Sequence, residues 1–261
     1  MTCWVLSAAA ILGTGGTAAH GAALLANYDL AGGSYANTLS GSTALGALAP
    51  LATSGSFGFV TSGTNPGWFW SGATTPGTGL SVTGLPANDG PTFGGYSIGM
   101  RFALGQVAGY RKLIDFRGSN VGQYVHDGLF RFYDGGFNTI VGGTIAANTT
   151  VDFVLTRAAG TGIVNAYLNG SATPIFSFVD GGDARADGLS LQFFRDDGAS
   201  GSEFSDSGAI SLLRIWNGPL TAEQIPTAMT AMVPEPAAGG LSIGGVAVGL
   251  WWLQRRRSKT R

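Results

Sequence analysis

The best candidates for metal chemistry are four carboxylates in a Gly- and Ser-rich segment, Asp196, Asp197, Glu203 and Asp206. Calcium takes about six to eight oxygen ligands from carboxylates and carbonyls on flexible loops, and this segment supplies several of them. The spacing is not that of an EF-hand, and Asp-Asp-Gly is also a common turn whose carboxylates accept hydrogen bonds from loop amides. Calcium binding and a loop without metal therefore stay open as alternatives. A second, weaker acidic group, interpreted by default as a solvated turn, comprises Asp180, Asp183 and Asp187.

Aromatic residues are candidates for a carbohydrate site, because sugar rings stack on the faces of Trp and Tyr. Trp68 and Trp70 follow a Pro-Gly pair and, two positions apart on a strand, share one face. Large aromatic side chains are mostly buried, so a place in the core is the favoured interpretation and sugar contact is the alternative. Tyr124 and His126 are two further ligand candidates, although a single His in such a place is more often a structural hydrogen-bonding group.

The sequence offers little for catalysis. Glycosidases need two carboxylates that flank the scissile bond, and on a strand these would form a Glu-x-Asp-x-Glu pattern, which is absent. The chain has only three Glu residues, two His residues and one Cys, which leaves few groups for nucleophilic schemes. We therefore expect a protein that is not an enzyme, with a glycoside hydrolase as the least favoured alternative.

Composition excludes several classes of protein. The 261 residues include 14 basic and 15 acidic side chains, and without an interior basic stripe this balance argues against nucleic-acid binding. Hydrophobic residues make up 44% of the chain, which excludes disorder driven by charge. The 44 Gly residues show no three-residue period, which excludes collagen.

The charge is unevenly distributed, because five of the basic residues lie in the last seven positions. Residues 237–253 carry no charge, and as a helix they would extend about 26 Å, slightly less than a hydrocarbon core of about 30 Å. Trp251 and Trp252 lie at the end nearest the arginines, as in an aromatic belt. This pattern predicts a transmembrane segment at 237–253 with a cytoplasmic tail at 254–261. A buried core helix is the alternative.

A three-part motif surrounds this segment. Val233-Pro234-Glu235-Pro236 ends a linker over 230–236, a Gly-rich apolar stretch follows, and Arg255, Arg256 and Arg257 come last. This arrangement resembles the PEP-CTERM protein-sorting signal. The resemblance implies recognition by an exosortase, a membrane protease of Gram-negative bacteria, and removal of the tail from a precursor anchored in the inner membrane. It further implies export to the envelope or extracellular matrix beside exopolysaccharide. An ordinary juxtamembrane linker is the alternative.

The N-terminus indicates the same compartment. Residues 5–12 form an apolar run, and Ala19-His20-Gly21 resembles a cleavage site, so 1–21 is predicted as a signal peptide. No Lys or Arg precedes Arg101, which makes the signal atypical or places the true start codon upstream. Cys3 is the single cysteine, so the mature chain is expected to form no disulfide.

The sequence pattern from 24 to 228 indicates β-strands, except for one helical segment near its end. Alternating or apolar runs predict strands at 96–104, 112–117, 129–133, 151–156, 163–168, 189–193 and 210–216. Asn169-Gly170 is a type I′ hairpin signal. Residues 220–229 are predicted to be helical, with Thr221 as the cap and Gln224 as its capping-box partner. Between 32 and 90 the Gly, Ser and Thr content leaves the strand pattern poorly defined. The prediction is one all-β sandwich over 22–229 with a short C-terminal helix.

The order of these elements resembles the laminin-G-like, concanavalin A-like jelly roll. The matching segments are 26–30, 95–98, 109–116, 167–170 and 208–225. The resemblance implies binding of sugars or proteins at loop rims, sometimes through calcium. The expected function is non-catalytic carbohydrate binding, with exopolysaccharide as the ligand. A structural or adhesive role with a surface protein as the partner is the alternative.

Overall fold

The computed structural model describes residues 22–41, 44–51, 55–63, 66–74, 77–85, 95–116, 120–135, 139–184, 190–196 and 203–230. The chain divides into two units, Met1–Met229 and Thr230–Arg261, and Thr230 alone of the second unit is described. The predicted signal peptide, transmembrane segment, tail and the sorting residues Val233 to Pro236 and Arg255 to Arg257 lie outside the described residues. Within those residues, no helix is long and apolar enough to cross a membrane.

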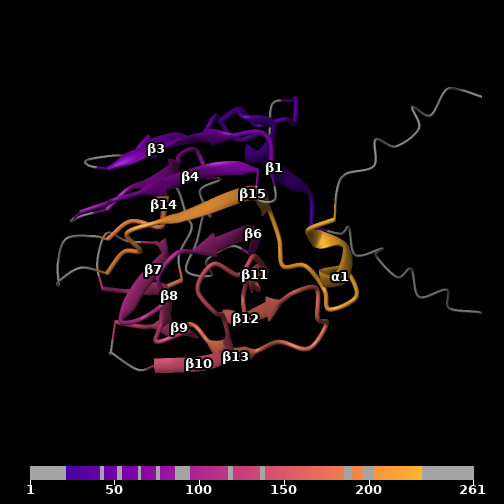
Figure 1. Cartoon of the computed structure of the whole chain (residues 1–261). Helices are drawn as coiled ribbons and strands as arrows, with labels where there is room; N and C mark the ends of the chain where they lie inside the picture. The colour runs from indigo at the N-terminus through magenta and orange to yellow at the C-terminus, as the bar shows by residue number, and fades with distance from the viewer. Residues whose placement is uncertain are drawn as a thin grey trace, which may run out of the picture. The chain divides into compact units, whose positions relative to one another are not determined.

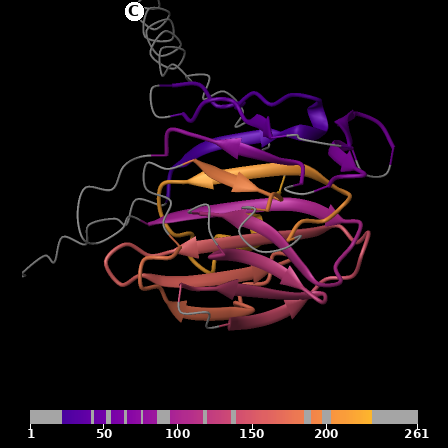
Figure 2. The same ribbon diagram turned by 90° about the vertical axis from the view of Figure 1, so that its left-hand side faces the viewer.

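The first unit is built from two antiparallel sheets (Figures 1 and 2). The eight-stranded sheet has the order β13-β12-β11-β6-β15-β4-β3, with β1 also paired to β15. Its strands are β1 (Leu24–Asp29), β3 (Ser56–Val60), β4 (Gly67–Ser71), β6 (Tyr96–Leu104), β11 (Val151–Arg157), β12 (Ile163–Leu168), β13 (Phe176–Val179) and β15 (Gly208–Trp216). A short 3-10 helix, η1 (Leu30–Gly32), follows β1.

The seven-stranded sheet has the order β10-β9-β8-β7-β14-β5-β2. Its strands are β2 (Ala49–Leu51), β5 (Gly79–Val82), β7 (Tyr110–Asp115), β8 (Gly122–His126), β9 (Leu129–Tyr133), β10 (Thr139–Thr144) and β14 (Leu191–Phe193). The first and last strands of the unit, β1 and β15, pair with each other. This all-β architecture is consistent with the predicted β-sandwich.

The core forms where the apolar faces of the two sheets meet. Because side chains alternate along a strand, β6 directs Ile98 and Phe102 to this inner face, where both are buried. Phe130 of β9 stacks on Phe153 of β11, with ring centroids 5.0 Å apart and planes 3° apart. This ring pair joins one sheet to the other.

Two local predictions need correction. Asn169 and Gly170 have positive φ values of 52° and 71°, and Ser171 N donates to Leu168 O at 3.0 Å, so the turn forms as predicted. The β12–β13 pairing, however, ends at Ala166 with Phe176, so this turn is one part of a longer loop and not a two-residue hairpin.

The helix is also shorter than predicted. α1 spans Ile225–Ala228 instead of 220–229. Thr221 is not the cap as predicted, because the N-cap is Gln224 and no side chain caps the helix. Thr221 N does donate to Gln224 Oε1 at 2.9 Å, the bond expected from one half of the capping box.

A second, smaller core lies on the outer face of the eight-stranded sheet, under α1. Trp216 and Met229 are buried there. Gly99 allows their close approach, because a Cβ at this position would lie 2.5 Å from the Met229 Sδ. Two arginines hold the end of the helix: Arg214 donates to Ala228 O at 2.7 Å and Arg101 to Met229 O at 2.8 Å. The C-terminal end of the sandwich is therefore fixed to the sheet.

Candidate functional site

Four side chains form an aromatic surface on the outer face of the seven-stranded sheet, and we call it the tyrosine face. It consists of Tyr110, Tyr124, His126 and Tyr133. Tyr110 of β7 is paired directly with His126 of β8, and Tyr133 of β9 with Gly122 of β8. Val125 of β8 and Phe132 of β9 lie in the core, so alternation places Tyr124, His126 and Tyr133 outside it, and pairing with His126 brings Tyr110 beside them.

The rings of the tyrosine face contact one another closely. Tyr110 stacks on His126 with centroids 3.8 Å apart and planes 14° apart. The Tyr133 hydroxyl lies 3.3 Å from His126 Nδ1, and the Tyr124 ring meets the Tyr133 ring edge-on at 5.2 Å. Tyr110 is 40% exposed, whereas Tyr124 is 1% exposed. Tyr110 is therefore the most exposed of the four rings, and the buried Tyr124 ring meets it edge-on at 6.2 Å.

Charged groups lie near the rings, and of these Lys112 and Asp115 are each 1% exposed whereas the Asp127 side chain is 63% exposed. Lys112 Nζ lies 5.3 Å from the centroid of Tyr124 and 3.8 Å from Asp115 Oδ2. The Tyr124 hydroxyl donates to Glu203 Oε2 at 2.9 Å, and His126 Nε2 lies 3.3 Å from Asp127 Oδ2. An exposed ring bordered by donors and acceptors is suited to a ligand with one apolar face and several hydroxyl groups.

Burial raises the pKa of one phenol of the tyrosine face, that of Tyr133. Burial first, and then a hydrogen bond and charge interaction with Tyr110, raise the pKa of Tyr133 from 10.0 to about 12, against an opposing effect of Arg131. Between these pH values the folded state retains a proton that the unfolded chain has lost. Stability should therefore fall as the pH rises through this interval.

Urea unfolding measured across this pH interval checks the expectation. The Tyr133→Phe variant has no phenol at this position, so its stability should decrease less steeply with pH than that of the parent. Equal slopes for the two proteins would contradict the assignment to Tyr133.

Three of the four predicted calcium ligands, Asp196, Glu203 and Asp206, are described by the structure. Asp196 is buried and its Oδ2 accepts from Glu203 N at 3.3 Å, while the Glu203 carboxylate accepts from Tyr124. Asp206 is exposed, and its Oδ1 accepts from the Ser207 hydroxyl at 3.0 Å. No group of three or more His, Cys, Asp or Glu residues able to hold a metal ion occurs in the described parts of the chain, and Asp197 lies outside them. Each of the three described carboxylates accepts a hydrogen bond within or beside this loop.

The sugar-contact alternative is wrong for Trp68 and Trp70. Their side chains are 0% and 1% exposed, their ring centroids lie 5.4 Å apart, and both belong to the main core. Trp70 Nε1 also donates to Ser205 O at 3.0 Å. The favoured interpretation, a place in the core, is the one that the structure confirms.

Sequence reasoning identified Tyr124 and His126 but missed Tyr110 and Tyr133 as members of the same surface. The signal for Tyr133 was present, because Phe132 beside it has the pattern of an inward-facing residue. The place of Tyr110 on this surface depends on the pairing of β7 with β8, which no short sequence motif encodes.

No protein-family model matches the sequence, and no curated protein matches it significantly. Solved structures are similar in fold. Domain 4 of AbnA, a GH43 extracellular arabinanase from Geobacillus stearothermophilus solved with arabinotriose, is 15% identical with a TM-score of 0.54, over 79% of this chain and 98% of that one.

Two larger proteins contain a similar fold. A botulinum neurotoxin type C structure, from work showing that cell entry depends on two ganglioside molecules, is 14% identical with a TM-score of 0.53, over 78% of this chain and 50% of that one. Trypanosoma rangeli sialidase is 14% identical with a TM-score of 0.51, over 79% of this chain and 32% of that one. This chain therefore spans half or less of these two proteins, and at such identities the likeness is one of fold.

Proposed function

We propose that the sandwich is a non-catalytic carbohydrate-binding domain and that the tyrosine face binds its polysaccharide ligand. The observation that carries the proposal is the exposed Tyr110 ring, stacked on His126 and next to the Tyr133 ring and the exposed Asp127 carboxylate. Stacking on His126 holds the ring in place before a ligand arrives, which reduces the entropy lost on binding.

The comparisons support this choice of ligand. One neighbour in fold holds arabinotriose, and another belongs to a toxin whose cell entry depends on gangliosides. We further propose the laminin-G-like, concanavalin A-like jelly roll as the topology and the extracellular matrix as the location, with exopolysaccharide as the ligand. The proposed location depends on the terminal segments, which resemble export signals.

The test is a change of Tyr110. A glycan array, including arabino-oligosaccharides, identifies a ligand, and isothermal titration calorimetry then compares variants. Tyr110→Ala should weaken binding about tenfold, because an aromatic contact contributes about 0.5–1.5 kcal/mol beyond its buried area. Tyr110→Phe keeps the ring and should bind nearly as well as the parent.

Phe57→Ala is the matched control. Phe57 is 43% exposed on β3 of the other sheet, so its removal tests the loss of an exposed ring away from the tyrosine face. Unchanged affinity in Tyr110→Ala would exclude this face as the binding site. A parent protein that binds no glycan, yet binds a surface protein, would favour the adhesive alternative.

A further inference from the structure

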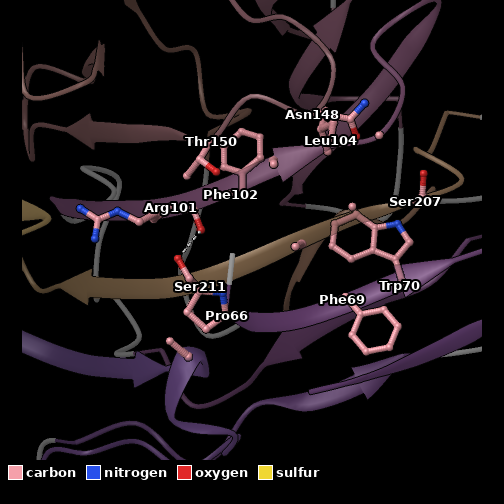
Figure 3. Close-up of a pocket in the computed structure, with 15 residues that line it drawn as sticks. Pro66, Phe69, Trp70, Arg101, Phe102, Leu104, Asn148, Thr150, Ser207 and Ser211 are labelled. Atoms are coloured by element: carbon pink, nitrogen blue, oxygen red, sulfur yellow. Dashed lines mark hydrogen bonds between the residues drawn. The ribbon is translucent and has the colours of Figure 1, made fainter. Parts of the chain in front are cut away.

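A groove of about 490 Å³ lies on the outer face of the eight-stranded sheet, over β4, β15 and β6 (Figure 3). Phe69 lies at one border of the groove, and Asn148 and Thr150 lie at the opposite border. Its size is within the range of about 300–1,000 Å³ typical of small-molecule sites. The groove and the tyrosine face are on different sheets, so they are separate surfaces of the same sandwich.

The residues that pair across the strands explain why the groove exists. Trp68 and Trp70 point into the core, so Phe69 between them points outward. Phe69 is paired with Gly58 of β3 on one side and with Ala209 of β15 on the other. Gly58 has no side chain and Ala209 has only a methyl group, so neither directly paired residue covers the half-buried Phe69 ring.

The floor of the groove has small side chains, and the border opposite Phe69 has polar ones. Ala209 is paired with Ala103 of β6, which keeps the floor low next to the ring. Beyond it, Asn148 and Thr150 contribute an amide and a hydroxyl, and the Ser211 hydroxyl donates to Arg101 O at 3.4 Å. The groove thus combines the Phe69 ring with neutral hydrogen-bonding groups.

The charges of the lining residues indicate which class of ligand fits the groove. None of the described residues that line the groove is acidic. Among the described lining residues, Arg101 is the single cation, and its guanidinium donates to both oxygens of Asp152 at 2.7 and 2.9 Å and to Met229 O. An arginine with these partners offers little attraction for an acidic ligand, so the lining fits a neutral molecule with an apolar face and hydroxyl groups.

We propose that this groove is a second carbohydrate site that binds neutral sugar units, so that one domain holds two glycan segments. The inference rests on the proposed function of the tyrosine face and extends it. Because the two sites lie on the outer sides of different sheets, separate segments fill them. A long polysaccharide would then bind with avidity or be cross-linked by the protein.

Two variants of the groove test this proposal. Phe69→Ala removes the ring, and Ala209→Arg fills the floor while leaving the core side chains unchanged. Calorimetry with a neutral oligosaccharide from the array should show two sites in the parent and one site in either groove variant. Tyr110→Ala should also leave one site, and Tyr110→Ala combined with Ala209→Arg should leave none. Thermal unfolding of each variant verifies the fold, and Ala209→Arg keeps the test valid if Phe69→Ala is unstable.

A long neutral polysaccharide provides the second measurement. Light scattering should rise when it is mixed with the parent and stay low with either single-site variant. One site in the parent, lost in Tyr110→Ala and unchanged in Ala209→Arg, would overturn the groove proposal and leave the proposed function intact. Binding abolished by Ala209→Arg but unaffected by Tyr110→Ala would support the groove and overturn the tyrosine face. No glycan binding by the parent would overturn both.

Discussion

Asp180→Ala should lower the free energy of unfolding by about 3–5 kcal/mol, the cost of breaking a buried ion pair by removing one partner. Arg157 Nε donates to Asp180 Oδ2 at 2.8 Å, and the two side chains are 3% and 1% exposed. The other oxygen, Oδ1, accepts from Asp183 N at 2.7 Å and Ala184 N at 3.0 Å. The alanine variant therefore leaves a buried guanidinium without its carboxylate and removes the acceptor of two loop amides. Urea unfolding followed by circular dichroism measures the loss.

The Arg101–Asp152 pair is the matched control. Its shortest distance is similar, 2.7 Å between Nε and Oδ1, but its side chains are 38% and 23% exposed. Water screens such a pair, so Asp152→Ala should cost at most about 1 kcal/mol. Equal losses in the two alanine variants would show that burial does not determine the contribution of these pairs.

Asp180 also shows why the sequence was an incomplete guide to this loop. The acidic group that contains it was interpreted as a solvated turn, because its neighbours are Gly and Asp. Its partner Arg157 lies 23 positions earlier, at the end of β11. Local composition carries no information about a partner that folding brings from another strand.

Strand prediction succeeded where large apolar side chains alternate and failed where they are sparse. β6, β9 and β12 have the predicted bounds, because large apolar side chains recur at every second position of β6 and β9 and an apolar run in β12 ends at the Asn169-Gly170 turn. Four strands, β2 to β5, lie in the segment between 32 and 90 whose pattern was poorly defined. Gly, Ser and Thr supply too few large side chains there to show a period of two.

A bulge in β7 explains why the tyrosine face was only half predicted. Strict alternation places Tyr110, Lys112 and Ile114 on one face, and Ile114 is in the core. The pairing with β8 shifts between Lys112 and Ile114, so Leu113 is an extra residue. Such a bulge reverses the side-chain direction of the residues before it, and Tyr110 and Lys112 therefore lie outside. The alternation rule alone predicts the opposite.

Trp70→Ala should lower the free energy of unfolding by about 3–5 kcal/mol, the usual cost of deleting a buried Trp side chain. The Trp70 ring lies 5.0 Å from the Phe194 ring, and Gly208, which has no side chain, leaves room for it. The variant also removes the donor that bonds Ser205 O. Trp70→Phe keeps part of the packing and should lose less. Thermal and urea unfolding measure both.

The control is Phe57→Ala. Phe57 is paired with Trp70 across β3 and β4 but is 43% exposed, so its removal should cost less stability than the removal of Trp70. The two interpretations of Trp70 predict a change in different quantities, the free energy of unfolding or the affinity for glycan. A core residue lowers stability while the folded fraction still binds glycan at the tyrosine face with the parent's affinity. A residue that contacts sugar lowers affinity at unchanged stability. Because the ring is 1% exposed, only the first result agrees with the geometry of β4, and the second would require the ring to leave the core.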